Sequence, residues 1–266
     1  MIILASIKDL SLERRMFMDY KIFIGLPAYN EEKSLPELFS KLIDFKNNIY
    51  ENLEVIVVDD GSTDDTKKII EEFCDKYSFI KAVYHNKNLG LGAAVNSIFK
   101  KVIDKAQDSD FLVTMDADNT HNPSQIIDMI KKIKKENLDL IVASRFTQGG
   151  KEIGVPLMRK LFSRGAKYFF KIFFNIKNIN DYSSGFRVYK VGYLRHSMEL
   201  YNNNLITTNG FDCMAEILAR FSKIGIKAAE YPLKLHYDLK NSASKMNVYE
   251  TILGYFDLLR RVKKPH

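Results

Sequence analysis

The sequence predicts an α/β fold with a doubly wound, mostly parallel β-sheet and flanking helices. The reason for this prediction is that apolar runs of strand length alternate with helical patterns through the first 143 residues. The 266 residues contain neither an internal repeat nor a linker rich in Pro and Gly, which favours one compact unit over two independent domains. Hydrophobic residues make up 46% of the chain, as expected for a globular core. We therefore expect a single compact domain.

The first half predicts a regular series of strands and helices. The run LEVIVV at 53–58 is nearly continuous in apolar residues, which is typical of a parallel strand covered on both faces. The other expected strands are residues 21–26, 80–84, 110–115 and 138–143. The expected helices are residues 31–46, 64–77, 90–103 and 123–136. Ligands of such sheets bind at the carboxyl ends of the strands, so the loops that follow the strands are candidate sites.

The alternation stops after residue 143. A loop containing Gly149 and Gly150 leads into a basic, aromatic-rich helix at about residues 155–174. Beyond it we expect strands at 186–189 and 228–235, helices at 211–221 and 247–263, and a polar loop at 238–244. These segments elaborate the same domain.

Charge is unevenly distributed along the chain. The formal net charge is +7, but residues 1–143 hold 19 Lys and Arg against 24 Asp and Glu, whereas residues 144–266 hold 21 against 9. An acidic half suits a metal cation, and a basic half suits an anionic partner or a membrane surface. The alternative is a soluble protein whose surface charge simply drifts along the chain.

No segment predicts secretion or a membrane span. The apolar stretch at residues 1–5 is too short for a signal peptide, and charged residues follow it at once. The aromatic stretch 168–174 is interrupted by Lys171 and is far below the roughly 18–20 apolar residues that a spanning helix needs. We expect any membrane contact to be peripheral or through a partner.

The strongest chemical motif is the pair Asp116 and Asp118, which directly follows the expected strand 110–115. Two carboxylates separated by one residue at the mouth of a strand can reach one hard divalent cation, leaving positions for phosphate oxygens and water. Mg²⁺ or Mn²⁺ with a nucleotide diphosphate fits this pattern. The alternative is an ordinary surface turn.

Two earlier strands also end in polar segments. Asp59 and Asp60 follow the strand 53–58, where one of them can accept a hydrogen bond from a nucleobase, although Asp, Gly and Ser also suit a simple turn. Tyr29 offers a flat face for a base and Glu31 an acceptor for base or ribose. A helix start with acidic residues explains Glu31 about equally well.

The segment Asn88-Leu89-Gly90-Leu91-Gly92 superficially matches a dinucleotide fingerprint. It follows the third expected strand rather than the first, and no acidic residue after a second strand is placed to hold a ribose. Its glycines more simply allow close backbone approach at a helix start.

Taken in order, Tyr-Asn-Glu at 29–31, Asp-Asp-Gly-Ser at 59–62, the 88–92 segment and Asp-Ala-Asp-x-x-His at 116–121 resemble family 2, GT-A-fold glycosyltransferases. Within that family the chain is similar to the polyprenyl-phosphate (dolichyl-phosphate) mannose and glucose synthases, from about residue 21 to 246. The resemblance implies an inverting transfer from a UDP- or GDP-linked sugar with Mg²⁺ or Mn²⁺ at Asp116 and Asp118. The nucleotide-sugar residues it implies are Pro27, Tyr29, Glu31, Asp59, Asp60, Asn88, Gly90, Asp116, Ala117 and Asp118.

The resemblance also divides the chain. Residues 1–20 are an N-terminal extension, residues 21–246 the glycosyltransferase domain, and residues 247–266 a basic amphipathic helix. Within the domain, residues 21–143 form the nucleotide-sugar half and residues 144–246 the acceptor half.

In the second half, Arg145, Arg159 and Ser163 match positions that bind the lipid phosphate in this branch. Arginine suits phosphate because its planar fork matches two oxygens. For Arg145 the alternative is a strand-end ion pair. Ser183-Ser184-Gly185-Phe186-Arg187 matches a segment expected to shape the acceptor pocket.

Further residues are implied around the sugar. Asp212 and Glu216, spaced i and i+4, share a helix face and are expected, with Asp118, to be catalytic. A solvated helix face is the alternative for Asp212. The segment 235–246 resembles a mobile loop that closes over the donor, but Leu239 and Lys240 stand where many relatives carry Arg. Lys240 and Lys245 are the remaining candidates for the diphosphate.

The acceptor follows from the same residues. A phosphate monoester, with a second pKa of about 6, needs no strong base, whereas a sugar hydroxyl needs a carboxylate such as Asp212 or Glu216. The helix 155–174 interleaves basic and aromatic residues and suits an anionic membrane interface, although core packing with a wet basic face is equally possible. Nucleic acid is not expected, because no recognised binding module is present and the cleft is acidic.

We therefore expect a metal-dependent glycosyltransferase acting on polyprenyl phosphate, cytoplasmic and peripheral at the inner face of the membrane, touching anionic lipid or a membrane partner protein. The alternative is a soluble family 2 enzyme that transfers sugar to a hydroxyl of a surface polysaccharide or glycolipid.

Overall fold

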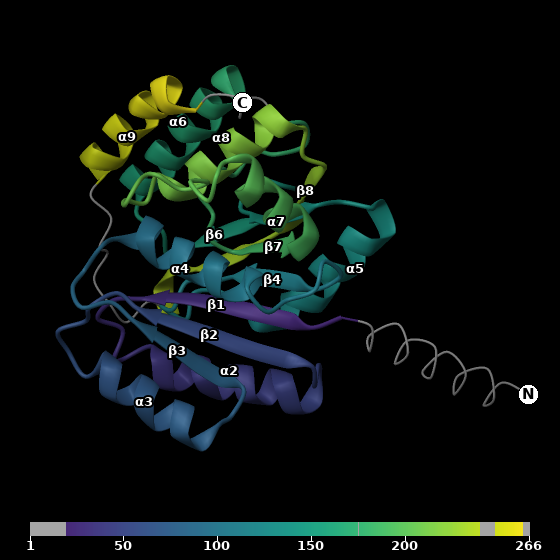
Figure 1. Cartoon of the computed structure of the whole chain (residues 1–266). Coiled ribbons are helices and arrows are strands. Elements are labelled where there is room, and N and C mark those ends of the chain that lie inside the picture. The colour runs from purple at the N-terminus through teal and green to yellow at the C-terminus, as the bar shows by residue number, and fades with distance from the viewer. Residues whose placement is uncertain (1–19, 175, 240–247, 263–266) are drawn as a thin grey trace, which may run out of the picture.

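The computed structural model describes residues 20–174, 176–239 and 248–262 (Figure 1). The first half follows the predicted alternation. Its elements are β1 (Ile22–Ala28), α2 (Leu35–Asn48), β2 (Leu53–Asp59), α3 (Thr66–Lys76), β3 (Ile80–Tyr84), α4 (Leu91–Ile103), β4 (Phe111–Thr114), the short 3₁₀ helix η1 (Pro123–Gln125), α5 (Ile126–Glu136) and β5 (Leu140–Ser144).

The second half adds β6 (Lys151–Ile153), α6 (Leu157–Phe173), β7 (Arg187–Lys190), α7 (Val191–Leu200), α8 (Cys213–Ile224), β8 (Ala228–Pro232), β9 (Lys234–His236), the 3₁₀ helix η2 (Tyr237–Leu239) and α9 (Val248–Arg261). Among the described residues no helix has the length and apolar composition to span a bilayer.

The main sheet has the order β3-β2-β1-β4-β7-β5-β8. All its pairings are parallel except those of β7, which runs antiparallel to β4 and β5. The carboxyl ends of β1, β2, β4 and β5 therefore point to the same edge, and the segments that carry Tyr29, Asp60, Asp116 and Arg145 leave the sheet there.

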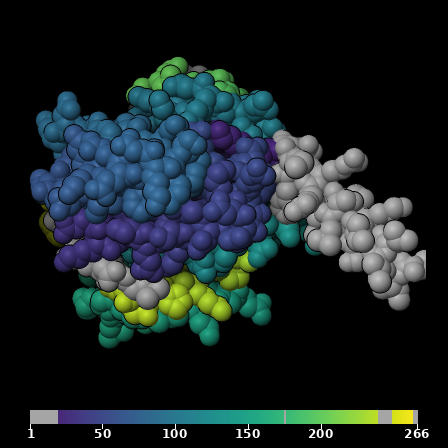
Figure 2. Space-filling model, turned by 90° about the horizontal axis from the view of Figure 1, so that it is seen from below, coloured from purple at the N-terminus to yellow at the C-terminus, as the bar shows by residue number. Residues whose placement is uncertain are grey.

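Two hydrophobic cores cover the faces of this sheet. Alternation along β1 sends Ile22, Ile24 and Leu26 into a core shared with α2, α3 and α5. Phe23 enters the other core, shared with α4, α6, α7, α8 and α9. Figure 2, viewed from below relative to Figure 1, shows the first face covered largely by the N-terminal part of the chain.

The structure corrects the prediction in three places. The expected strand 228–235 breaks after Pro232, and Leu233 leads into β9, which pairs with β6 in a separate two-stranded parallel sheet. The Leu233 amide still donates to Ser144 O of β5 (2.9 Å), while Leu233 O accepts the Lys151 amide of β6 (2.9 Å), so the chain passes from one sheet to the other at this residue. Both β6 and α7 lie where no element was predicted. Most of the expected polar loop 238–244 lies outside the described residues.

Candidate active site

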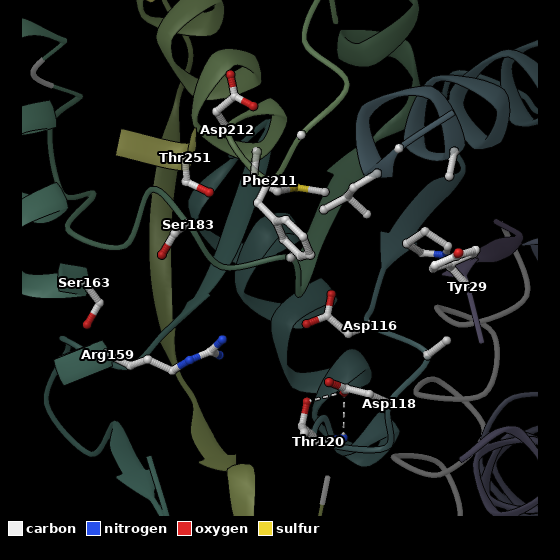
Figure 3. A pocket seen from close by; sticks show the side chains of 18 of the residues that line it. Tyr29, Asp116, Asp118, Thr120, Arg159, Ser163, Ser183, Phe211, Asp212 and Thr251 are labelled. Carbon is white, nitrogen blue, oxygen red and sulfur yellow. Dashed lines mark hydrogen bonds between the residues drawn. The ribbon is translucent and has the colours of Figure 1, made fainter. Parts of the chain in front are cut away.

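A cavity of about 810 Å³ opens where the carboxyl ends of the strands meet the second half of the chain (Figure 3). Residues predicted for the donor and for the acceptor both line it. From the first half these are Pro27, Tyr29, Glu31, Asp60, Asn88, Gly90, Asp116, Ala117 and Asp118. From the second half they are Arg145, Arg159, Ser163 and Asp212. The structure therefore brings residues predicted from both halves of the chain together at one cavity.

Asp116 and Asp118 lie at the centre of this cavity, in the loop after β4. The side chain of Asp116 is 44% exposed, while Asp118 is buried and its Oδ1 accepts hydrogen bonds from Thr120 Oγ1 (2.6 Å) and the Thr120 amide (3.2 Å). Gly185 faces Asp116, and a Cβ at this glycine would lie 2.6 Å from Asp116 Oδ1. The missing side chain leaves room for the carboxylate.

His121 supports the Asp116 loop from behind. Its Nδ1 accepts a hydrogen bond from the Asp116 amide (3.2 Å), and its ring stacks on Phe186 with the centroids 5.1 Å apart. Because Nδ1 accepts, the neutral ring carries its proton on Nε2, which lies 3.9 Å from Asp116 Oδ2. His121 thus helps to fix the backbone of the loop that carries Asp116.

The donor set fits a hard divalent cation. Carboxylate oxygens are preferred ligands of Mg²⁺ and Mn²⁺. Within the described part of the chain no group of three His, Cys, Asp or Glu side chains is arranged to hold a metal. An ion at Asp116 and Asp118 would therefore take further ligands from phosphate oxygens and water, as expected for a metal that arrives with a nucleotide diphosphate.

The loop after β1 and the loop after β2 are hydrogen-bonded to each other near the predicted nucleotide-binding residues. The Asn30 amide donates to Ser62 Oγ (2.9 Å) and the Glu31 amide to Thr66 Oγ1 (2.7 Å). The Thr63 amide donates in return to Asn30 Oδ1 (2.8 Å). These bonds join the start of α3 to the loop after β1 and hold Tyr29 and Glu31 at the cavity wall.

Asp60 supports the glycine segment as well as lining the cavity. Its carboxylate accepts hydrogen bonds from the amides of Leu89 (3.0 Å) and Gly90 (2.8 Å) and pairs with His85 Nδ1 at 2.6 Å. Asp59 differs from the prediction. It is buried, does not line the cavity, and accepts a hydrogen bond from the Ser62 amide (3.1 Å), as the turn interpretation expects.

Arg145 lines the cavity but forms the ion pair that was the alternative interpretation. Its Nε and Nη2 bind both oxygens of the fully buried Asp181 at 2.8 and 2.7 Å, and Nη2 also donates to Ser183 Oγ. Burial alone would raise the pKa of Asp181, but the charge and hydrogen bonds of Arg145 outweigh it and lower that pKa. Arg145 therefore shapes the wall, and its predicted contact with phosphate would have to come from its remaining donors.

Arg159 and Ser163 lie one turn apart on α6. Together with Phe162 and Ala166 they form the helix face that lines the cavity, at the spacing i, i+3, i+4, i+7. The guanidinium of Arg159 lies over the Tyr237 ring, 5.3 Å from its centroid. Figure 3 shows it pointing across the cavity toward Asp116.

Asp212 lines the cavity at the end remote from Asp118 (Figure 3). It is 7% exposed, and burial raises the pKa of its carboxyl group, an effect that the charge of Arg261 partly offsets. Gly254 of α9 passes directly over it, since a Cβ there would lie 2.6 Å from Asp212 Oδ2. A buried carboxyl group whose pKa is raised in this way accepts a proton more readily than an exposed Asp does.

Glu216 does not lie where the sequence predicts. It is fully buried, does not line the cavity, and its oxygens accept hydrogen bonds from Thr207, Thr208 and Arg220. Burial opposes its ionisation, but these bonds and the charge of Arg220 lower its pKa. The expectation that Glu216 faces the sugar is therefore corrected. Lys240 and Lys245 lie outside the described residues.

Further residues line the cavity, and most of them were not predicted. Phe211, Thr251 and Tyr255 face the same cavity, as does Ser183. Ser183 belongs to the segment that was expected to shape the acceptor pocket, but nothing in the sequence indicated that α9 would reach back to the cavity with Thr251 and Tyr255.

The fold, the paired carboxylates and the facing arginine define a glycosyltransferase of the GT-A class. Comparison with known proteins agrees: the sequence profile "Glycosyl transferase family 2" matches residues 23–197. The chain belongs to glycosyl transferase family 2, whose members invert the configuration at the transferred sugar.

Named relatives are similar over most of the chain. A "Dolichol-phosphate mannosyltransferase" of Pyrococcus furiosus is 34% identical over 207 residues, which cover 77% of this chain and 54% of that protein. The chain thus matches only about half the length of that relative. A "UDP-N-acetylglucosamine--dolichyl-phosphate N-acetylglucosaminyltransferase" of Methanococcus voltae is 28% identical over 254 residues, covering 91% of this chain and 96% of that protein.

Among solved structures, glucosyl-3-phosphoglycerate synthase from Mycobacterium tuberculosis, in complex with Mn²⁺, UDP and glucosyl-3-phosphoglycerate, superposes with a TM-score of 0.61. It is 17% identical, and the match covers 93% of this chain and 82% of that one. At this identity the likeness establishes the fold alone.

Proposed function

We propose that this protein transfers a hexose, with inversion, from a UDP- or GDP-linked sugar to a polyprenyl phosphate at the inner, cytoplasmic face of a membrane. The observation that carries the proposal is that one cavity holds Asp116 and Asp118 on one side and Arg159 with Ser163 on the other. An anionic donor held through a metal and an anionic acceptor held by arginine would meet between them. The relatives named for dolichyl-phosphate acceptors support the choice of acceptor.

On the donor side, the residues position a leaving group. Asp116 and Asp118 would hold Mg²⁺ or Mn²⁺, which supplies positive charge to the departing diphosphate when bound. Tyr29 and Glu31 would contact base or ribose, and the Gly90 backbone, held by Asp60, allows a close approach. Each of these groups acts by fixing the anomeric carbon for in-line attack.

On the acceptor side, the nucleophile is already ionised. A phosphate monoester with a second pKa of about 6 carries its attacking negative charge at neutral pH and needs no general base. Arg159 and Ser163 would supply donors to the phosphate oxygens. Stacking on Tyr237 restricts the Arg159 guanidinium and so reduces the entropy lost on binding.

The outer faces of α6 and α9 support a membrane contact. Large apolar side chains are at least half exposed on both helices, namely Leu157, Met158, Leu161, Tyr168 and Ile172 on α6 and Tyr249, Leu253 and Phe256 on α9. Basic residues lie among them, including Arg164 and Lys171. This combination suits a helix in an anionic lipid interface.

The decisive assay offers wild-type protein a panel of UDP- and GDP-sugars with polyprenyl phosphate or a saccharide, with Mn²⁺ or EDTA. Transfer to the lipid that EDTA abolishes supports the proposal, and transfer to the saccharide alone refutes it.

Asp118→Asn should lower kcat on the order of 10²–10³-fold, because charge on the leaving group is no longer offset.

A matched pair of arginines tests the phosphate contact. Arg159→Ala should raise the KM for polyprenyl phosphate at least tenfold, because a charge-assisted contact is lost. Arg164→Ala, on the same helix but outside the cavity lining, should leave that KM within about twofold when both variants are assayed with a short-chain polyprenyl phosphate without vesicles, where the proposed membrane contact of Arg164 plays no part. Equal effects of the two variants would contradict a direct role for Arg159.

The membrane contact has its own test. Replacing Leu161, Ile172 and Leu253 together with Ser should weaken co-sedimentation with anionic vesicles several-fold, because exposed apolar area is lost. Ile49, also half-exposed but at the end of α2, provides the control substitution. Binding that survives the triple substitution would argue against this face.

Transfer to a sugar hydroxyl is the second candidate function, and the enclosed Asp212 with its raised pKa is the observation that favours it. Asp212→Asn distinguishes the two. A hydroxyl acceptor would lose 10²-fold or more in kcat, together with the acidic limb of the pH profile. A phosphate acceptor should retain most of its rate at high pH.

A further inference from the structure

Beneath the cavity lies a buried carboxylate that the proposed chemistry does not use. Glu216 Oε2 accepts the amides of Thr207 (2.8 Å) and Thr208 (3.0 Å). Its Oε1 accepts Thr207 Oγ1 (2.5 Å) and both Nε (3.1 Å) and Nη2 (2.9 Å) of Arg220. Glu216 is 0% exposed, so every contact it makes is with the protein.

Thr207 and Thr208, whose amides Glu216 binds, directly precede residues that line the cavity. Asn209, Gly210, Phe211 and Asp212 follow Thr208 and all line the cavity. Because Glu216 holds Thr207 and Thr208 in place, it also restricts the positions of Phe211 and Asp212, which are only a few residues further along the chain.

The same segment contacts the start of α4 through backbone atoms. Asn209 O accepts the Gly92 amide (3.0 Å). A Cβ at Gly90 would lie 2.2 Å from Asn209 O, and one at Gly92 would lie 1.8 Å from Thr208 O. The acceptor half thus rests directly on the nucleotide-side helix.

The start of α4 has a second, independent support. Asp60 binds the amides of Leu89 and Gly90 and is itself paired with His85. Loosening the 207–212 segment should therefore leave the nucleotide side in place.

We propose that Glu216 is a positioning residue, which sets the place of the 207–212 segment, with Phe211 and Asp212, at the acceptor end of the cavity. This rests on the proposed function only in the identity of the acceptor. Glu216 acts through Thr207 and Thr208 and does not touch the substrate.

Glu216→Gln is the sharpest test, since the amide is the same size but sets its N–H₂ against donors from Thr207, Thr208 or Arg220. We expect kcat to fall and the acceptor KM to rise, with kcat/KM for the acceptor down on the order of 10²-fold, because small misplacements are costly in in-line transfer. The Kd of UDP or GDP with Mn²⁺, measured by calorimetry, should change less than about twofold because Asp60 still holds α4.

Asp110→Asn is the matched control. Asp110 is likewise buried and accepts two amides, those of Lys21 (2.7 Å) and Gln107 (2.7 Å), but it precedes β4 at the edge opposite the cavity. The Asp110→Asn variant should have a lower Tm but the same acceptor kinetics as wild type. Thr207→Val removes the hydroxyl's hydrogen bonds with Glu216 and Arg220 but keeps the backbone bond to Glu216. It should move the acceptor kinetics in the same direction by several-fold, and it serves if Glu216→Gln fails to fold.

Two results would overturn the proposal. One is acceptor kinetics in Glu216→Gln and Thr207→Val that change no more than in Asp110→Asn at a similar loss of Tm. The other is an equal loss of nucleotide and acceptor binding. If wild type uses a saccharide rather than polyprenyl phosphate, the proposed function fails, but the same comparison with the saccharide still decides the role of Glu216.

Discussion

At Gly185 the absence of a side chain determines where a functional carboxylate lies. The residue follows two serines in the segment before β7, and its Cα faces Asp116 Oδ1. Thr114 Oγ1 also donates to Gly185 O (2.7 Å), which fixes this backbone against β4. The sequence pattern marked the segment as part of the acceptor pocket, but its contact with the metal loop could not be predicted because 69 residues separate the two positions.

Gly185→Ala should displace the Asp116 carboxylate without unfolding the protein, because only the end of a side chain must move. We expect the affinity for Mn²⁺ in the presence of UDP or GDP to fall about tenfold, as for other changes that reorient a metal ligand. Calorimetric titration of Mn²⁺ measures this. Nucleotide binding in EDTA is the internal control and should not change. Unaltered Mn²⁺ affinity would show that Asp116 is not held by this contact.

Among the elements, α8 explains why one catalytic prediction failed. The spacing of Asp212 and Glu216 places them on the same helix face, and that inference assumes that one face looks onto a site. Residues 213–221 of α8 are all buried, and of these only Met214 lines the cavity, so Glu216 faces the protein interior. Arg220, one turn after Glu216, supplies the countercharge. Charge and spacing alone could not distinguish a carboxylate facing substrate from one facing a buried arginine.

The helix α9 covers the acceptor end of the cavity, and Gly254 sets how closely it packs there. Gly254→Ala should move α9 away from Asp212 and lower transfer several-fold, because Thr251 and Tyr255 move with it. Gly165→Ala is the matched control in α6, where a Cβ meets nothing within 4 Å. It should raise stability by up to about 1 kcal/mol through helix propensity, with kinetics unchanged. Kinetics and thermal melts of both variants provide the comparison.

Over the whole molecule, the order of elements in the first half could be predicted because its strands are continuous apolar runs between turn residues. The short strands β6 and β9 are rich in Lys, Glu and His and carry no such signal. The antiparallel direction of β7 was also not predictable, because the sequence of a four-residue strand does not indicate which way it runs relative to its neighbours. Likewise, the partner of Arg145 lies 36 residues away, so its ion pair becomes visible only in the fold.

The pH dependence of stability is a property of the whole molecule, and this ion pair should contribute to it at acidic pH. Arg145 lowers the pKa of the fully buried Asp181 below its unfolded value of about 3.9. The stabilisation is therefore complete above about pH 5 and is lost as the pH falls through the unfolded and then the folded pKa. Asp181→Asn should lower the free energy of unfolding by about 3–5 kcal/mol at pH 7. Denaturant melts should show this difference shrinking below pH 4, and a constant difference would contradict the linkage.

The placement of α6 and α9 has a consequence for how the two substrates are found. Each helix gives one face to the cavity and another, apolar face to the exterior, so a protein resting on a bilayer through these faces keeps its acceptor end beside the lipid. The donor would arrive by diffusion in three dimensions and the acceptor by diffusion in two. The rate should then follow the mole fraction of polyprenyl phosphate in the vesicle surface, and not its concentration in the bulk suspension.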